Sequence, residues 1–242
     1  MSTGYTLALD AMGGDLGPQP SFEAALVCLE SFPRLQLQWI GPANQLDDML
    51  ADVPASQQHL LSRITVIGAD EVIEMADDVL VALRQKQNSS MTVALRQVAD
   101  GHADACVTCG NSAALMALSR QLLAILPGFD RPAFASHIPT SSQPCLVVDM
   151  GANLAPSAEQ LLQYAVAGQA LEQALQPDQT VKVGLLNIAA ETGKGQLEVQ
   201  QAHTLLQAHA ELTYDGFVEP QDVFKGKVNV LVCDGYAGNV LI

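Results

Sequence analysis

The sequence is poor in basic residues. Only 11 Lys and Arg stand against 26 Asp and Glu, which gives a formal net charge of −15. Nucleic-acid binding without sequence preference needs a basic footprint, and adhesion to anionic membranes needs clustered cations. The charge therefore disfavours both classes of partner. A small anion stays possible, because backbone N–H groups and one or two local cations can bind it whatever the net charge.

Long apolar runs and a usable set of disulfide cysteines are also lacking. No run of 18 apolar residues exists, and no charged-then-apolar signal segment opens the chain. Five cysteines form an odd set that fits no disulfide framework in a chain of 242 residues. We therefore expect a cytoplasmic protein with reduced thiols.

Aromatic residues make up only 5% of the sequence, whereas hydrophobic residues make up 49%. An interior of Ala, Val, Leu and Ile suits a parallel sheet that is covered on both faces by helices. The length allows one large domain or two small ones. The composition therefore points to an α/β protein with a well-buried core.

Short aliphatic runs alternate with longer segments of helical period. This alternation predicts βαβ units with right-handed crossovers, and hence a largely parallel sheet with helices on both faces. The predicted strands are residues 5–10, 35–40, 63–67, 105–108, 133–137, 146–149, 181–188 and 228–234. The predicted helices are residues 21–31, 78–86, 91–99, 112–126, 157–174 and 196–210.

We expect a single α/β catalytic domain over residues 1–242, with a small subdomain as an alternative. Residues 139–144 (PTSSQP) are the loosest stretch and the candidate for a loop at a subdomain junction. The chain ends directly after a strand and turn that should lead into another helix. A C-terminal part is therefore expected to be missing.

Five predicted strands are followed by loops of small residues with Asp or Asn. The loops are residues 10–15 (DAMGGD), 109–112 (CGNS), 149–153 (DMGAN), 187–195 (NIAAETGKG) and 233–239 (CDGYAGN). In a parallel sheet the carboxyl ends of the strands share one edge, where ligands bind. Glycine lets the backbone approach a ligand, and helix N-termini favour negative charge. Together the loops predict an anion-binding cleft that suits phosphate.

Lys194 is a scarce cation in one of these loops. Its segment is not a Walker A loop, because Ile188 stands where the first Gly belongs and Gly195 replaces the Ser or Thr. No GxGxxG fingerprint is present either. Lys194 is interpreted as a point charge on phosphate or on a developing oxyanion, with a solvated loop lysine as the alternative.

Patterns for metal binding and for covalent catalysis are weak. Cys106 and Cys109 spell CxxC without a second pair, and the five histidines form no HExxH array. His137 ends a predicted strand and is interpreted as a surface histidine or a cleft residue. No GxSxG elbow exists. We expect no metal, and a bound phosphate acting as nucleophile would need no nucleophilic side chain.

Taken in order, the loops resemble the PlsX family of phosphate acyltransferases. The matching segments are residues 7–15, 88–91, 110–111, 114–116, 130–132, 148–153, 184–188, 232–235 and 238–240. The resemblance implies that phosphate attacks the thioester of acyl-acyl carrier protein, giving acyl phosphate for phospholipid synthesis. It also implies a fold like isocitrate and isopropylmalate dehydrogenases, a homodimer and no cofactor. Peripheral membrane contact is implied only for full-length members, whose C-terminal helical region is absent here.

The resemblance also assigns site residues. Lys194 and Asn239 are implied as catalytic or polarising groups. The residues implied to bind phosphate or to shape the cleft are Asp10, Gly13, Gly14, Asn111, Ser112, Asp149, Gly151, Asn153, Asn187, Asp234 and Gly235. An acidic carrier protein would need a local basic patch. Candidates for that patch are Arg84, Lys86, Arg96, Arg120 and Arg131.

Several positions depart from the family pattern. Leu16 stands where the family usually has His, and residues 189–192 (AAET) replace a Gly-Glu-Glu-Glu loop. These departures leave two alternatives open. One is a degenerate, non-catalytic homologue that binds phosphate or carrier protein, and the other is a phosphotransacetylase-like enzyme that uses acyl-CoA.

Overall fold

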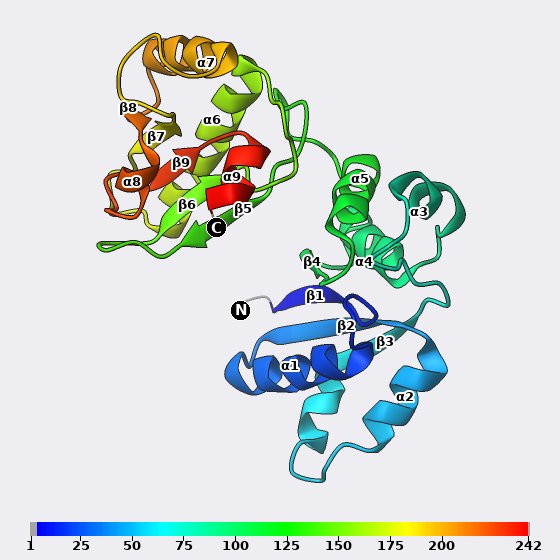
Figure 1. The fold of residues 1–242 in the computed structure, drawn as a ribbon. Coiled ribbons are helices and arrows are strands. Elements are labelled where there is room, and N and C mark those ends of the chain that lie inside the picture. The colour runs from blue at the N-terminus through cyan, green and yellow to red at the C-terminus, as the bar shows by residue number, and fades with distance from the viewer. Residues whose placement is uncertain (1–3, 242) are drawn as a thin grey trace. The chain divides into compact units, whose positions relative to one another are not determined.

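The computed structural model describes residues 4–241, and the chain divides into two compact units, Met1–Ala124 and Ile125–Ile242 (Figure 1). We call them unit 1 and unit 2. Each unit has its own sheet, whereas the sequence patterns led us to expect one. Within residues 4–241 no helix is both long and apolar enough to cross a bilayer.

Unit 1 contains a four-stranded parallel sheet of order β3-β2-β1-β4. Its strands are β1 (Tyr5–Asp10), β2 (Leu35–Gly41), β3 (Ile64–Gly68) and β4 (Ala105–Val107). Its helices are α1 (Pro18–Ser31), α2 (Ala43–Ala51), α3 (Val79–Gln85), α4 (Ser90–Ala99) and α5 (Ser112–Leu122), with a 3-10 turn at Gln58–Arg63. Helices connect the successive strands because parallel neighbours need crossover connections.

Both faces of the unit 1 sheet are buried, as the aliphatic runs predicted. Neighbouring residues of a strand point to opposite faces. Trp39 packs into the cluster beneath α1 and stacks on Phe22 with ring centroids 4.8 Å apart. The next residue, Ile40, enters a different cluster that contains Ala94 of α4. Helices therefore cover β2 on both sides.

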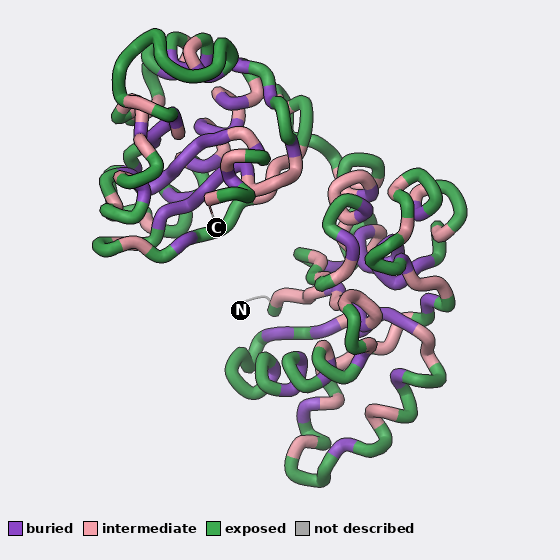
Figure 2. Tube along the Cα trace, viewed as in Figure 1, coloured by how far each residue is buried: buried purple, intermediate pink, exposed green. Residues whose placement is uncertain are grey.

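Unit 2 contains a five-stranded sheet of order β5-β6-β9-β7-β8. Its strands are β5 (Ala135–Ile138), β6 (Cys145–Val148), β7 (Val183–Leu186), β8 (Tyr214–Val218) and β9 (Val230–Val232). All neighbours are parallel except β5, which runs antiparallel to β6. The helices are α6 (Ala158–Leu175), α7 (Leu197–Ala208), α8 (Pro220–Val223) and α9 (Gly235–Leu241). The central strands are the most deeply buried part of this unit (Figure 2).

Helix α6 lies tightly against the unit 2 sheet. It begins with a capping box between Ser157 and Gln160, which the sequence Ser-Ala-Glu-Gln makes possible. A Cβ atom added at Gly168 would lie 2.6 Å from Cγ1 of Val230, so the helix can approach β9 only because residue 168 is glycine. This close packing sets the depth of the helix over β6 and β9.

Most predicted elements are confirmed, but the structure also contains elements that the patterns missed. Strand β8 was not predicted, because Asp215 and Gly216 in its centre disfavour a strand by composition. The short helices α2 and α8 were missed as well. Residues 139–144 do not mark a junction, so that interpretation was wrong. They form the turn between β5 and β6, held by Ser141 N–H on Phe224 O at 2.9 Å.

Candidate active site

Asp149 follows the interior strand β6 of unit 2 and is completely buried. Its Oδ1 accepts hydrogen bonds from the backbone N–H groups of Phe134 (3.0 Å), Gly151 (3.2 Å) and Ala152 (3.0 Å). Its Oδ2 accepts from Asn153 N–H at 2.6 Å and from Asn153 Nδ2 at 2.9 Å. The carboxylate is therefore fully hydrogen-bonded to its own loop and to the segment before β5, and it shapes the site without facing a ligand.

Asn153 and two glycines extend this rigid loop to helix α9. Asn153 Nδ2 also donates to Pro132 O at 2.9 Å, and Asn153 O accepts from Gly235 N–H at 2.8 Å. A Cβ atom at Gly235 would lie 2.8 Å from Asn153 O, and one at Gly238 would lie 1.9 Å from Asp149 O. Both glycines are needed because the backbone of α9 lies directly on the loop.

Asn239 is the exposed polar residue of this assembly. Gly151 has a φ of +130°, and a Cβ atom there would lie 3.6 Å from Asn239 Oδ1, so the two residues are neighbours. Among residues 4–241 the Asn239 side chain has no hydrogen-bond partner, which leaves it available to a ligand. Asp234, by contrast, accepts from Ala237 N–H at 2.8 Å and starts α9.

The loop after β7 is closed by a buried side chain. Asn187 is 6% exposed and donates from Nδ2 to Ala189 O (2.9 Å) and to Lys194 O (3.0 Å). Gly195 has a φ of +93°, and a Cβ atom there would lie 2.0 Å from Asn187 Oδ1. The Lys194 backbone is therefore anchored, while its side chain is exposed and forms no ion pair in the described part of the chain.

A cavity of about 350 Å³ opens beside these loops in unit 2. The N-cap residues of α6 and α7, Ser157 and Gln196, line it together with Glu198 and Asp234. Helix N-termini favour anions, whereas the two carboxylates oppose them. Asp234 is the one predicted site residue on its wall. Ser157 and Gln196 were missed, although their places at helix starts were a usable signal.

In unit 1 a buried aspartate joins two loops. Asp10 is 3% exposed, and its Oδ1 accepts from Met12 N–H at 3.1 Å. Its Oδ2 accepts from the Thr108 hydroxyl at 2.6 Å, which in turn accepts from Gly110 N–H at 3.0 Å. The sequence predicts Thr108 only as the last residue of a strand, and its part in the site depends on a contact with a distant residue.

Two predicted glycines of unit 1 shape the loop after β1. A Cβ atom at Gly13 would lie 2.7 Å from Thr108 Oγ1 and 2.9 Å from Cys109 N. Gly14 has a φ of +102°, which side chains with a Cβ rarely adopt. The close approach to β4 and the turn that follows it both depend on glycine here.

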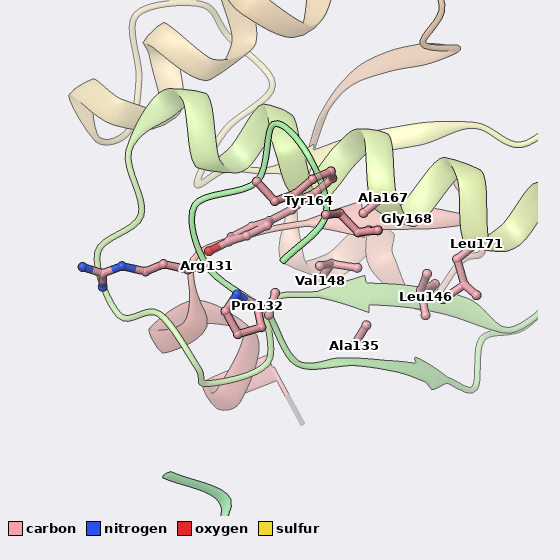
Figure 3. Close-up of a pocket in the computed structure, with 12 residues that line it drawn as sticks. Arg131, Pro132, Ala135, Leu146, Val148, Tyr164, Ala167, Gly168 and Leu171 are labelled. Carbon is pink, nitrogen blue, oxygen red and sulfur yellow. The ribbon is translucent and has the colours of Figure 1, made fainter. Parts of the chain in front are cut away.

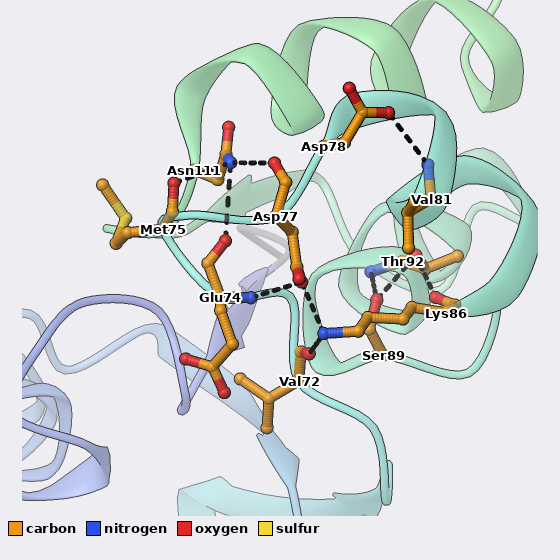
Figure 4. A network of polar contacts seen from close by, with 10 residues as sticks. All are labelled: Val72, Glu74, Met75, Asp77, Asp78, Val81, Lys86, Ser89, Thr92 and Asn111. Carbon is orange, nitrogen blue, oxygen red and sulfur yellow. Dashed lines mark hydrogen bonds and ion pairs between the residues drawn. The ribbon is translucent and has the colours of Figure 1, made fainter.

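Asn111 is buried, and like Asp149 it makes all its side-chain hydrogen bonds within the protein. Its Oδ1 accepts from Ala114 N–H at 3.0 Å and so caps α5. Its Nδ2 donates to three carbonyl oxygens, those of Glu74, Met75 and Asp77, at 3.2–3.4 Å (Figure 4). The side chain thus ties the segment before α3 to the start of α5.

Lys86 belongs to the same network and is not a free cation. Its ammonium donates to Val72 O at 2.7 Å and contacts the Asp77 carboxylate (Figure 4). The hydrogen bond from Lys86, aided by Glu74 N–H, holds the pKa of Asp77 below its usual value. Of the predicted basic patch, Lys86 is therefore engaged, whereas the four arginines form no ion pair within residues 4–241.

Ser112 is the exposed candidate of unit 1. It is the first residue of α5, and its side chain makes no hydrogen bond within the described residues. The predicted site residues thus fall into two groups. The buried Asp and Asn residues and the glycines hold the loops, the half-buried Asp234 starts α9 and lines the cavity, and Ser112, Lys194 and Asn239 are free to contact a ligand.

The chain is similar to known proteins over almost its whole length. The chain matches the fatty acid synthesis protein family over residues 5–242. It is 45% identical over 236 residues to a phosphate acyltransferase of Pseudomonas putida, covering 98% of this chain and 69% of that protein. It is 44% identical over 241 residues to a phosphate acyltransferase of Shewanella sp. strain MR-4, covering 99% and 70%.

Solved structures show the same fold at low identity. EutD phosphotransacetylase from Staphylococcus aureus aligns with a TM-score of 0.65 at 17% identity, covering 98% of this chain and 80% of that one. A branched-chain phosphotransacylase from Enterococcus faecalis aligns with a TM-score of 0.59 at 15% identity, covering 98% and 82%. The α/β fold with parallel strands is confirmed, and the family match over almost the whole chain shows that this protein belongs to the fatty acid synthesis protein family.

Proposed function

We propose that this chain transfers an acyl group from acyl carrier protein to inorganic phosphate, releasing acyl phosphate for phospholipid synthesis. The observation that carries the proposal is the 45% identity, over 98% of the chain, to a protein named phosphate acyltransferase. The low-identity likeness to phosphotransacetylases reflects a common fold and does not favour acyl-CoA as the donor.

The chemistry needs no nucleophilic side chain. A phosphate oxygen attacks the thioester carbonyl carbon, the resulting oxyanion collapses, and the C–S bond breaks. The sulfur leaves with the carrier and takes up a proton. When two substrates are held in line, most of the rate acceleration comes from their positioning. In the proposal, Lys194 supplies positive charge to the phosphate or the oxyanion, and the Asn239 amide donates a hydrogen bond.

The cavity of about 350 Å³ in unit 2 is our candidate for the phosphate position. The N-termini of α6 and α7 border it, which favours an anion. Because Glu198 and Asp234 border it too, a nearby cation is required. Lys194 stands two residues before Gln196 of the cavity wall, in a loop anchored by Asn187, and is proposed to be that cation.

The experiment measures free thiol released from palmitoyl carrier protein with and without phosphate. We expect phosphate-dependent release, reduced by Lys194→Ala at least about 100-fold, as for the loss of one oxyanion-hole donor. Lys182→Ala is the matched control. Lys182 is also a solvent-exposed lysine of unit 2, but it is paired with Asp215 and precedes β7, whereas the proposed site follows β7. Release that ignores phosphate, or equal activity of both variants, would contradict the proposal.

Donor identity and assembly extend the same proposal. Replacing palmitoyl carrier protein with palmitoyl-CoA should lower the rate, and a preference for CoA would favour the phosphotransacetylase alternative. Binding of carrier protein without turnover would favour the non-catalytic one. The acidic carrier is proposed to meet the unpaired arginines of either unit, such as Arg84, Arg120 or Arg131. We also propose that the protein is a cytoplasmic homodimer with a fold like that of isocitrate dehydrogenases.

A further inference from the structure

Unit 2 contains an apolar pocket of about 260 Å³ between helix α6 and strands β5 and β6 (Figure 3). Ten of its twelve lining residues are apolar, and Leu146, Val148 and Leu171 form much of its wall. Ligand pockets typically measure about 300–1,000 Å³ and are lined mainly by hydrophobic residues. This pocket lies just below that range, which suits one segment of an alkyl chain.

Tyr164 brings a single buried donor to the pocket. The residue is 1% exposed, yet its hydroxyl has no hydrogen-bond partner among residues 4–241. Asn153 lies nearby but spends both amide hydrogens on Pro132 O and Asp149 Oδ2. Burial raises the pKa of Tyr164 to about 12, which keeps the hydroxyl a hydrogen-bond donor far into the alkaline range. Buried polar groups normally have partners, and this one lacks an acceptor.

The polar end of the pocket adjoins the candidate active site. Val148 of the wall precedes Asp149, and Pro132 of the wall accepts a hydrogen bond from Asn153 at 2.9 Å. Arg131 stands at this end with its guanidinium extended outward, exposed and without an ion pair in the described chain (Figure 3). The adjacent Asp130 is instead engaged with Gln163 through two hydrogen bonds.

The pocket has an apolar body, with one unsatisfied hydroxyl donor and a cation at the same end. These features match an alkyl chain that ends in an oxygen-rich group. We infer that this pocket holds the first part of the acyl chain, with its carbonyl oxygen accepting from the Tyr164 hydroxyl and with Arg131 at the same end, where the phosphate is added. The inference rests on the proposed function, because it places the acyl group of that reaction.

Decanoate binding to the whole chain, measured by isothermal titration calorimetry, tests the pocket directly. Ala167→Leu fills the pocket and should weaken binding more than 10-fold. Ala170→Leu is the matched control, since it is the same change on an exposed face of α6 outside the pocket, and it should leave binding unchanged. No binding by the unchanged protein, or equal effects of the two variants, overturns the inference.

Tyr164→Phe separates the hydroxyl from the fold. We expect decanoate affinity to fall about 5-fold, as for one hydrogen bond, while the urea midpoint stays unchanged or rises because an unpartnered hydroxyl is removed. Arg131→Gln should lower decanoate affinity about 3-fold at low salt and less at high salt. Unaltered affinity in both variants overturns the assigned carbonyl and head-group positions.

The outcomes also separate the pocket from the proposed reaction. Decanoate binding that responds to Ala167→Leu, without phosphate-dependent thiol release, would contradict the reaction and leave the pocket supported. Thiol release whose dependence on acyl-chain length is the same in Ala167→Leu and Ala170→Leu would support the reaction and overturn the pocket.

Discussion

The two units place a buried aspartate at the end of a strand, but they use it differently. Asp10 in unit 1 accepts two hydrogen bonds, and one of them comes from the side chain of Thr108 at the end of the neighbouring strand. Asp149 in unit 2 accepts five, four of them from the backbone. The first carboxylate links two loops through a side chain, whereas the second gathers backbone N–H groups, three from its own loop and one from the segment before β5. A strand-end aspartate can therefore organise loops without touching a ligand.

The largest expected effect follows from removing the second carboxylate. Asp149→Ala leaves several buried donors unpaired, and each costs about 1–3 kcal/mol. We expect the free energy of urea unfolding to fall by at least about 3 kcal/mol. Asp10→Ala should cost less, because only two donors lose a partner. Equal losses for the two variants would contradict the difference between the units.

A close backbone contact gives the next effect. Gly238→Ala forces a methyl group against Asp149 O, and overpacking of this kind costs about 1–3 kcal/mol. The control is Gly216→Ala, because Gly216 has a positive φ but nothing within 4 Å, so it reports backbone strain alone. Thermal unfolding should show a larger loss for Gly238→Ala. A larger loss for Gly216→Ala would mean that α9 does not depend on this contact.

The link between the unit 1 loops can be cut without changing side-chain size. Thr108→Val removes the hydroxyl that joins Asp10 to Gly110 N–H, and we expect a loss of about 1–3 kcal/mol in chemical unfolding, since the hydroxyl bonds a carboxylate. Ser112→Ala, at an exposed site, should change stability by no more than about 0.5 kcal/mol. If the two variants behave alike, the loops of unit 1 are held by something other than this hydroxyl.

Lowering the pH should give the smallest change in stability, and it should destabilise unit 2 before unit 1. Burial lowers the pKa of His203, which donates to or accepts from Tyr214 OH at 2.7 Å and stacks on Phe217. Because the folded pKa lies below the ordinary 6.5, the unfolded chain binds the proton first. Stability is then lost as the pH falls from about 6.5 toward the folded pKa. His59 and His102 of unit 1 are exposed.

Hydrogen exchange in acid would check this order. Amides of α7 and β8 should lose protection before those of β1 and β2. His203→Gln should flatten the dependence of unfolding free energy on pH in that range. Simultaneous loss in both units, or a slope unchanged by the substitution, would remove His203 as the cause.

Several features of the site could be predicted because they depend on neighbouring residues. The alternation of aliphatic runs predicted β1 as observed, and the Gly and Asn content marked all five strand-end loops. The roles within those loops could not be read in the same way. Asp10 is hydrogen-bonded to Thr108, which is 98 residues away in the sequence, and Asn111 to Glu74, which is 37 residues away. Nothing local distinguishes such a residue from one that faces a ligand.

By itself the sequence determined the α/β class, the family and the places of the loops, since periodicity, turn composition and family motifs are local properties of the chain. The tertiary structure decided the division into two sheets, the engagement of Lys86 and Asp149, and the exposure of Lys194 and Asn239. It also formed the apolar pocket at Tyr164. Burial and hydrogen-bond partners arise only when distant segments pack together. The same type of side chain can contact a ligand where it stays unpaired, and it holds the fold where its hydrogen bonds are satisfied.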